Sequence, residues 1–204
     1  MNNNWNRFIY KIWSPIYDYF FNSGLFLEAR KRVFQDIEFK AGDSVLFVGV
    51  GTGADINHVP YNSLKVTAID FSEDMLNQAR KKYEGEKIDF IQMDAQSMNL
   101  PDNTFDYVIG SLILTVVPDG KKAFDEMVRV TKSGGQIVVF DKFADSTRDL
   151  PLSKRFIRPL IRILGTDIGI SFNAILSESE NVKLIEKKDI LFNGMYQKIV
   201  LRKV

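Results

Sequence analysis

The stretch Val45-Leu46-Phe47-Val48-Gly49-Val50-Gly51-Thr52-Gly53 is an apolar run that breaks into three alternating glycines. Such a run predicts a buried parallel strand, and the glycines predict a tight turn whose backbone approaches a ligand closely. A second, mostly apolar run covers residues 65–69 and stops at Asp70. A carboxylate at the end of that strand can bind the hydroxyls of a ribose. The stretch therefore predicts a crevice for a nucleotide-like cofactor.

Strands and helices alternate outward from this stretch. Helices are expected at 5–16, about 24–37, from Ser72 to 83–85, and at 123–131, where Ser133-Gly134-Gly135 stops the last one. Another is expected after the glycine loop, around His58. Strands are expected at 44–48, 65–69, 88–92, 107–109 and 136–140, followed by a hairpin of 182–190 and 196–202 around Phe192-Asn193-Gly194. The pattern predicts an α/β fold: a Rossmann-like, doubly wound seven-stranded sheet, mostly parallel, with an antiparallel C-terminal hairpin and helices on both faces.

The length of 204 residues and a hydrophobic content of 45% favour a single domain over 1–204. We expect an N-terminal helical lid at 1–40, a cofactor-binding core at 41–141, a substrate-cap insertion at 142–181 and the hairpin at 182–204. Residues 5–16 and 154–164 combine basic and apolar side chains. This composition is typical both of lid helices and of helices that lie on an anionic membrane surface.

Composition excludes several classes of function. Lys and Arg number 27 against 26 Asp and Glu, so the net charge of +1 gives no global field for nucleic acid. One His, no Cys and no clustered carboxylates make a poor metal-ligand set, so no metal is expected. Without a leader-like N-terminus or an apolar run near 20 residues, we expect a cytoplasmic protein, with the inner membrane face as its surface if the basic helices dock.

Ligand-type residues stand at the ends of successive predicted strands. Asp70 ends the second strand and Met75 follows in the next helix, while Met93-Asp94-Ala95 ends the third strand. These positions share the carboxyl edge of one sheet, where open α/β folds bind ligands. The loop also fits the G-x-G-x-x-A form of a dinucleotide fingerprint, so a nicotinamide-dependent oxidoreductase is the alternative from another class.

With these motifs in order, the chain resembles the class I S-adenosylmethionine-dependent methyltransferases over nearly its whole length. The resemblance implies S-adenosylmethionine as cofactor, S-adenosylhomocysteine as product and a small-molecule or lipid acceptor. It implies that the glycine loop passes under the methionine and ribose, that Asp70 binds the ribose, that Met75 packs on adenine and that Asp94 binds the adenine amino group. The cofactor-site residues expected from it are Gly49, Val50, Gly51, Gly53, Asp70, Phe71, Met75, Asp94, Ala95, Ser111 and Leu112.

A narrower resemblance concerns the substrate. Tyr10-x-x-Trp13-x-Pro15-x-Tyr17-Asp18 and Leu114-Thr115-Val116-Val117-Pro118-Asp119 are similar to segments of bacterial phosphatidylethanolamine N-methyltransferases and of the related quinone methyltransferases. The resemblance implies that the N-terminal segment closes over the cofactor. Tyr10, Tyr17 and Asp18 are then the candidates that orient the acceptor amine or take its proton. A phospholipid amine is the preferred acceptor and a quinone the alternative.

One residue departs from the family pattern. The family usually has an acid two residues before the first loop glycine, where this chain has Phe47. Because that acid helps to hold the methionine amino group, we expect reduced or rearranged cofactor binding, and a noncatalytic cofactor-binding protein stays an alternative. For His58 and Asp106 the expected roles are structural.

Overall fold

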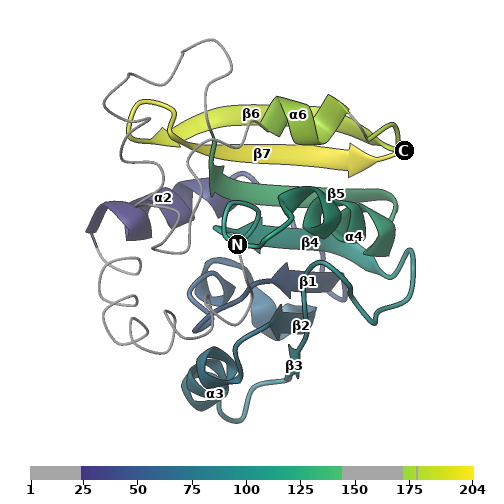
Figure 1. Cartoon of the computed structure of the whole chain (residues 1–204). Coiled ribbons are helices and arrows are strands. Elements are labelled where there is room, and N and C mark those ends of the chain that lie inside the picture. The colour runs from purple at the N-terminus through teal and green to yellow at the C-terminus, as the bar shows by residue number, and fades with distance from the viewer. Residues whose placement is uncertain (1–23, 144–171, 178) are drawn as a thin grey trace.

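The computed structural model describes residues 24–143, 172–177 and 179–204. These residues contain one seven-stranded sheet in the order β3-β2-β1-β4-β5-β7-β6 (Figure 1). The strands are β1 (Ser44–Val48), β2 (Lys65–Asp70), β3 (Ile88–Gln92), β4 (Phe105–Ser111), β5 (Thr131–Lys142), β6 (Val182–Leu191) and β7 (Tyr196–Lys203). The first five are parallel, and β7 runs antiparallel to both β5 and β6. The predicted α/β sheet with its antiparallel C-terminal hairpin is confirmed.

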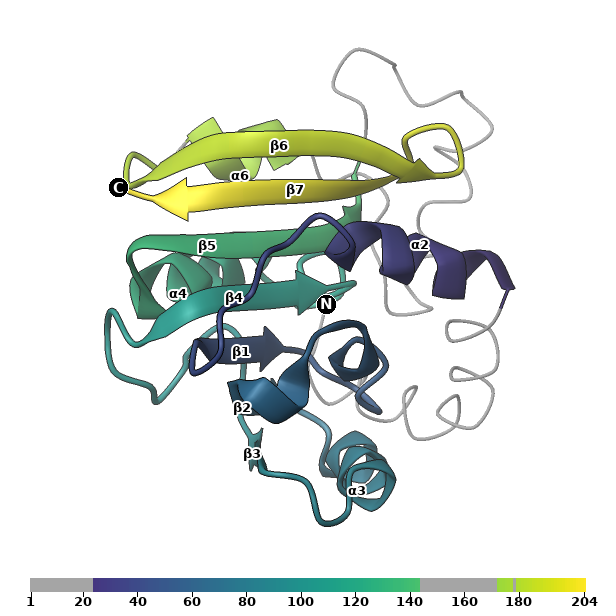
Figure 2. The ribbon, with the colours of Figure 1, turned by 180° about the vertical axis from the view of Figure 1, so that it is seen from behind.

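Helices cover both faces of the sheet. α4 (Gly120–Val130) and α6 (Phe172–Ser177) lie on the face turned forward in Figure 1, and α2 (Gly24–Phe34) lies on the opposite face in Figure 2. α3 (Glu73–Lys82) contributes its buried Leu76 to the core on the α2 side. Side chains of a strand point alternately to either face. In β1, Leu46 and Val48 therefore join the core under α4, while Val45 and Phe47 join the core under α2.

Most element boundaries follow the local sequence signals. β1 and β3 span the predicted residues, and the other predicted strands are one to five residues longer at an end. Ser72 caps α3, since its hydroxyl accepts a hydrogen bond from the Met75 amide at 3.4 Å, as its place before two acids predicts. The predicted helix at 24–37 ends at Phe34.

Two local predictions are wrong. The segment after the glycine loop forms two short 3₁₀ turns, η1 (Ile56–His58) and η2 (Tyr61–Ser63), instead of an α-helix, and Pro60 between them has no amide hydrogen to continue a helix. Ser133-Gly134-Gly135 does not end α4; it lies within β5, where the pairing with β4 is irregular. A Cβ at Gly135 would lie 2.9 Å from the Lys132 carbonyl oxygen, so the close backbone approach requires glycine there.

The two basic amphipathic segments at 5–16 and 154–164 lie outside the described residues, as do most of the expected lid and cap. Among the described helices, none has the length and apolar content that a bilayer-spanning segment requires.

Candidate functional site

The parallel strands end at one edge of the sheet, which we call the carboxyl edge. Gly49, Gly51 and Gly53 follow β1 there, and all three have positive φ, at 68°, 56° and 80°. A Cβ at Gly49 would lie 2.5 Å from Cδ1 of Ile113, and one at Gly53 would lie 2.7 Å from the Tyr83 ring. A Cβ at Gly51 would meet no atom within 4 Å. Side chains of the protein therefore pack against the loop at Gly49 and Gly53, and the space beside Gly51 is open.

Asp70, the last residue of β2, faces this loop. Its Oδ2 accepts a hydrogen bond from the Gly51 amide at 2.8 Å, and its Oδ1 accepts one from the Ser72 amide at 2.8 Å. Burial raises the pKa of the Asp70 carboxyl above its ordinary value, and hydrogen bonds from the Ser72, Gly51 and Phe71 amides oppose that shift in part. A carboxylate has about four lone-pair positions, so Asp70 retains acceptor capacity for a ligand hydroxyl.

The neighbours of Asp70 differ in exposure. Val50 is buried, and its amide donates to the Ile69 carbonyl oxygen at 3.0 Å, which ties the loop to β2. Phe71 leaves 38% of its surface exposed at the end of β2. Met75 is buried in the first turn of α3. The assignment of Phe71 and Met75 to the cofactor stays a prediction.

Asp94 follows β3 and is bound by a residue that sequence reasoning missed. The Gln96 side-chain amide donates to Asp94 Oδ1 at 2.9 Å, while Gln96 Oε1 accepts from the Asp119 amide at 2.9 Å. Gln96 therefore connects the end of β3 to the segment before α4. Ala95 between them is buried. A glutamine two residues after an acid gives no sequence signal for such a bridge.

Ser111 and Leu112 mark the end of β4. Ser111 Oγ is buried and has no hydrogen-bond partner among the described residues. Leu112 has a φ of 56°, a left-handed conformation that costs an ordinary side chain about 1–2 kcal/mol, and its amide donates to the Phe140 carbonyl oxygen at 2.7 Å. An unsatisfied hydroxyl beside a strained residue is typical of a ligand-binding position.

Asp141, near the end of β5, is a second residue that sequence reasoning missed. It is fully buried, and its carboxylate accepts hydrogen bonds from the Thr115 hydroxyl at 2.7 Å and the Thr115 amide at 3.2 Å. Burial raises the pKa of Asp141. The signal was present, since Asp141 directly follows the predicted strand 136–140 as Asp70 follows the predicted strand 65–69.

Phe47 has only 2% of its surface exposed and lies in the core beneath α2. Its neighbours in that core include Ala68, Ile109 and Phe140. An acid at this position would be buried among apolar side chains at a cost of several kcal/mol unless it were paired. The phenylalanine therefore supports packing, and the expected effect on cofactor binding stays a prediction.

Other singled-out residues lie away from the glycine loop or outside the described part. The His58 ring stacks on Phe34 with centroids 6.2 Å apart, and burial lowers the His58 pKa. Asp106, near the start of β4, accepts hydrogen bonds from the Ser44 amide and from Lys132 at the opposite edge. Tyr10, Tyr17 and Asp18 lie outside the described residues.

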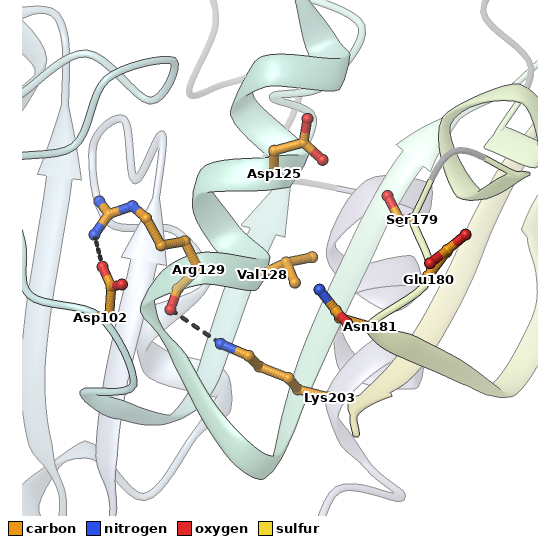
Figure 3. A pocket seen from close by; sticks show the side chains of 8 residues that line it. All are labelled: Asp102, Asp125, Val128, Arg129, Ser179, Glu180, Asn181 and Lys203. Carbon is orange, nitrogen blue, oxygen red and sulfur yellow. Dashed lines mark hydrogen bonds and ion pairs between the residues drawn. The ribbon is translucent and has the colours of Figure 1, made fainter.

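A cavity of about 360 Å³ lies at that opposite edge, between the end of α4 and the end of β7 (Figure 3). The five N–H groups of Arg129 meet Glu126, Asp102 and the carbonyl oxygens of Met98 and Leu100. Lys203 donates to three oxygens. Because the N–H groups of Arg129 and Lys203 already donate to protein oxygens, they are not available to bind an anion in the cavity. These hydrogen bonds instead join the end of α4 to the end of β7.

The residues at the carboxyl edge fit S-adenosylmethionine. Gly51 leaves open space over the loop, Asp70 has acceptor capacity for ribose hydroxyls, and Ser111 Oγ lacks a partner among the described residues. Asp94 brings an acceptor carboxylate to this edge from a third strand end, and its assignment to adenine stays a prediction.

Comparisons with known proteins agree with this geometry. A family model described as a methyltransferase domain matches residues 46–139. The chain is 30% identical to phosphatidylethanolamine N-methyltransferase of Cereibacter sphaeroides over 191 residues, 92% of both chains. It is 35% identical to demethylmenaquinone methyltransferase of Clavibacter sepedonicus over 116 residues, 56% of this chain and 46% of the relative.

The fold matches solved structures as well. A chain from the complex between the Haloferax volcanii Trm112 methyltransferase activator and the putative methyltransferase superposes with a TM-score of 0.79 at 14% identity, covering 97% of this chain and 96% of that chain. Taken with the full-length relative, these observations show that the chain belongs to the class I S-adenosylmethionine-dependent methyltransferases.

Proposed function

We propose that the methyl acceptor is the primary amine of a phosphatidylethanolamine headgroup. The observation that carries this proposal is the extent of the match. Similarity to the phosphatidylethanolamine N-methyltransferase covers 92% of both chains, so it extends beyond the cofactor-binding core into the regions expected to form the lid and the substrate cap. Similarity to the demethylmenaquinone methyltransferase covers 56% of this chain.

The carboxyl edge also carries exposed apolar side chains that suit a lipid. Phe192 and Met195 lie in the turn between β6 and β7, and Tyr196, the next residue, pairs with Lys142 at the end of β5. Phe192 is 52% exposed, and its ring contacts Phe26 of α2 with centroids 6.1 Å apart. Its φ of 52° is a conformation that a bulky residue rarely adopts. An aromatic held in that conformation at the edge of the site supports contact with acyl chains or headgroups.

In the proposed mechanism, the chain binds and orients. Gly51 and its loop neighbours support the methionine and ribose, Asp70 accepts from the ribose hydroxyls, and Asp94 accepts from the adenine amino group. When bound, S-adenosylmethionine supplies an electrophilic methyl carbon, whose bond to sulfur breaks as the acceptor nitrogen forms its bond, leaving a neutral thioether. Alignment of the amine with that carbon is the main contribution of the protein, and such positioning can contribute about 7–11 kcal/mol.

The amine must be neutral to react. A primary amine with an ordinary pKa of about 10.4 needs roughly 4–5 kcal/mol to lose its proton near pH 7. A closed apolar site beside a positive charge lowers that cost by desolvation and like-charge repulsion. The candidates that orient the amine or accept its proton remain Tyr10, Tyr17 and Asp18. The proton that the amine loses then passes to solvent.

The test is transfer of labelled methyl from S-adenosylmethionine into vesicles of phosphatidylethanolamine and an anionic phospholipid, with product identification. We expect monomethylated phosphatidylethanolamine. The double variant Phe192→Asn, Met195→Asn should lower the vesicle rate by about tenfold while the affinity for S-adenosylhomocysteine stays unchanged.

The matched control is Leu184→Asn. Leu184 is 41% exposed on the same hairpin but lies near the start of β6, away from the carboxyl edge, so this variant should keep the vesicle rate. If the labelled methyl group enters a demethylated quinone and not the lipid, quinone methylation replaces this proposal. Equal losses in the control would refute the role of the edge side chains.

A further inference from the structure

The segment 112–119 connects β4 to α4 and lies at the carboxyl edge between the glycine loop and β5. Its residue Ile113 packs its side chain against Gly49, since a Cβ there would lie within 3.1 Å of three Ile113 atoms. The Ile113 carbonyl oxygen accepts hydrogen bonds from the amides of Val116 and Val117 at 3.0 and 3.1 Å, which makes the segment a tight turn. The segment begins with Leu112 in its left-handed conformation. Such a conformation persists only where surrounding contacts hold it.

Two anchors hold the segment from outside. At its centre, Thr115 is 1% exposed and donates both its hydroxyl and its amide to Asp141. At its end, the Asp119 amide donates to Gln96, whose side-chain amide in turn donates to Asp94. A chain of side-chain and backbone contacts thus runs across the carboxyl edge from β5 to the end of β3.

Asp141 is built for this contact. Its surface is 0% exposed, so its carboxylate does not reach a substrate, and its Oδ1 also accepts from the Lys142 amide at 2.8 Å. Hydrogen bonds between a carboxylate and neutral donors are about twice as strong as neutral ones, and in a buried site they fix geometry. Burial of a carboxyl carries a cost that an apolar residue would avoid. A geometric requirement on the Thr115 turn accounts for the acid at this position.

We propose that Asp141 is a positioning residue for methyl transfer. Through Thr115 it fixes segment 112–119, and this segment in turn holds Ser111 and Leu112 in place at the site and Ile113 under the glycine loop. The proposal rests on the family reaction and not on the identity of the acceptor, so it survives if the lipid assignment fails.

The main variants are Asp141→Asn and Thr115→Val. The side-chain amide in Asp141→Asn would retain one acceptor oxygen and present an NH₂ group to a second donor, while Thr115→Val removes the hydroxyl bond and keeps the amide bond. Both should raise amide hydrogen exchange at residues 115–117 by about tenfold and leave exchange in β1 and β2 unchanged. Both should lower kcat by about tenfold while the Kd of S-adenosylhomocysteine, measured by calorimetry, changes less than about threefold, because Asp70 and Gly51 are untouched. Thr115→Ser keeps the hydroxyl and should restore both exchange and kcat.

Asp106→Asn is the matched control. Asp106 also accepts from a backbone amide and a hydroxyl, those of Ser44 at 2.9 Å each, but at the opposite edge of the sheet. This variant should lower stability without changing kcat or exchange at 115–117. If Asp141→Asn does not fold, Thr115→Val and Thr115→Ser decide. Unchanged exchange at 115–117 in Thr115→Val, or an equal loss of kcat in Asp106→Asn, would overturn the proposal.

Discussion

Gly49 and Gly51 stand two residues apart in the glycine loop, with similar φ values and opposite surroundings. Alanine at Gly49 would meet both backbone strain and the Ile113 side chain at 2.5 Å, so it should lower stability by about 2–5 kcal/mol. Alanine at Gly51 meets only the strain, about 1–2 kcal/mol, but its methyl group would enter the space assigned to the ligand. Urea unfolding and calorimetry with S-adenosylhomocysteine should therefore show the larger stability loss at Gly49 and a large affinity loss with little unfolding at Gly51. Normal binding by Gly51→Ala would place the ligand elsewhere.

Asp70 is the basis of two predictions, one for ligand affinity and one for the pH dependence of stability. Asp70→Asn loses the charge and one acceptor oxygen, so affinity for S-adenosylhomocysteine should fall about 10–100-fold, while Asp74→Asn on the exposed first turn of α3 should keep it.

The pKa of Asp70 is raised in the folded state, so between 3.8 and that raised value the folded protein binds more protons than the unfolded chain. The stability of the wild type relative to Asp70→Asn should therefore decrease as pH rises through this window. Urea titrations from about pH 4 to 8 check the sign, and an increase would contradict it.

At the scale of elements, the features that were predicted well from the sequence are those that local signals determine. Glycine turns and a Ser cap placed β1, β2 and α3 within a residue or two, and the rule that parallel strands end at one edge brought Asp70 and Asp94 to the same side of the sheet. Contacts between distant segments were not predictable. Gln96 and Asp141 bind segment 112–119 across 23 and 26 residues, and the local sequence does not indicate that either residue contacts this segment. The irregular start of β5 was missed for the same reason, since the close approach of distant backbone at Gly135 decides it. The 3₁₀ turns after the loop had a local signal in Pro60.

At the scale of the whole molecule, the site depends on how the helices on the two faces of the sheet are connected to the glycine loop. Segment 112–119 leads into α4 on one face. On the other face, Arg30 of α2 forms a buried ion pair with Asp55, two residues after Gly53. The Asp55 carboxylate makes no capping bond to η1, so its side chain serves the ion pair with α2. The ion pair thereby ties α2 to the segment that follows the glycine loop, and the ring contacts of Phe26 with Phe192 and Tyr196 connect α2 to the hairpin.

This ion pair yields a prediction about the integrity of the domain. Removing one partner breaks the buried ion pair while the other charge stays buried, so Arg30→Met and Asp55→Leu should each cost about 3–5 kcal/mol of unfolding free energy. The double variant buries apolar groups instead and should cost clearly less than the sum. The exposed pair Lys31 and Glu28 on the same helix is the control, and its removal should leave the unfolding free energy nearly unchanged. Because Asp55 follows the glycine loop by two residues, the single variants should also weaken S-adenosylhomocysteine binding, and the double variant should recover part of it. Additive costs in urea unfolding would show that Arg30 and Asp55 stabilise the fold independently and that α2 is held by its apolar face alone.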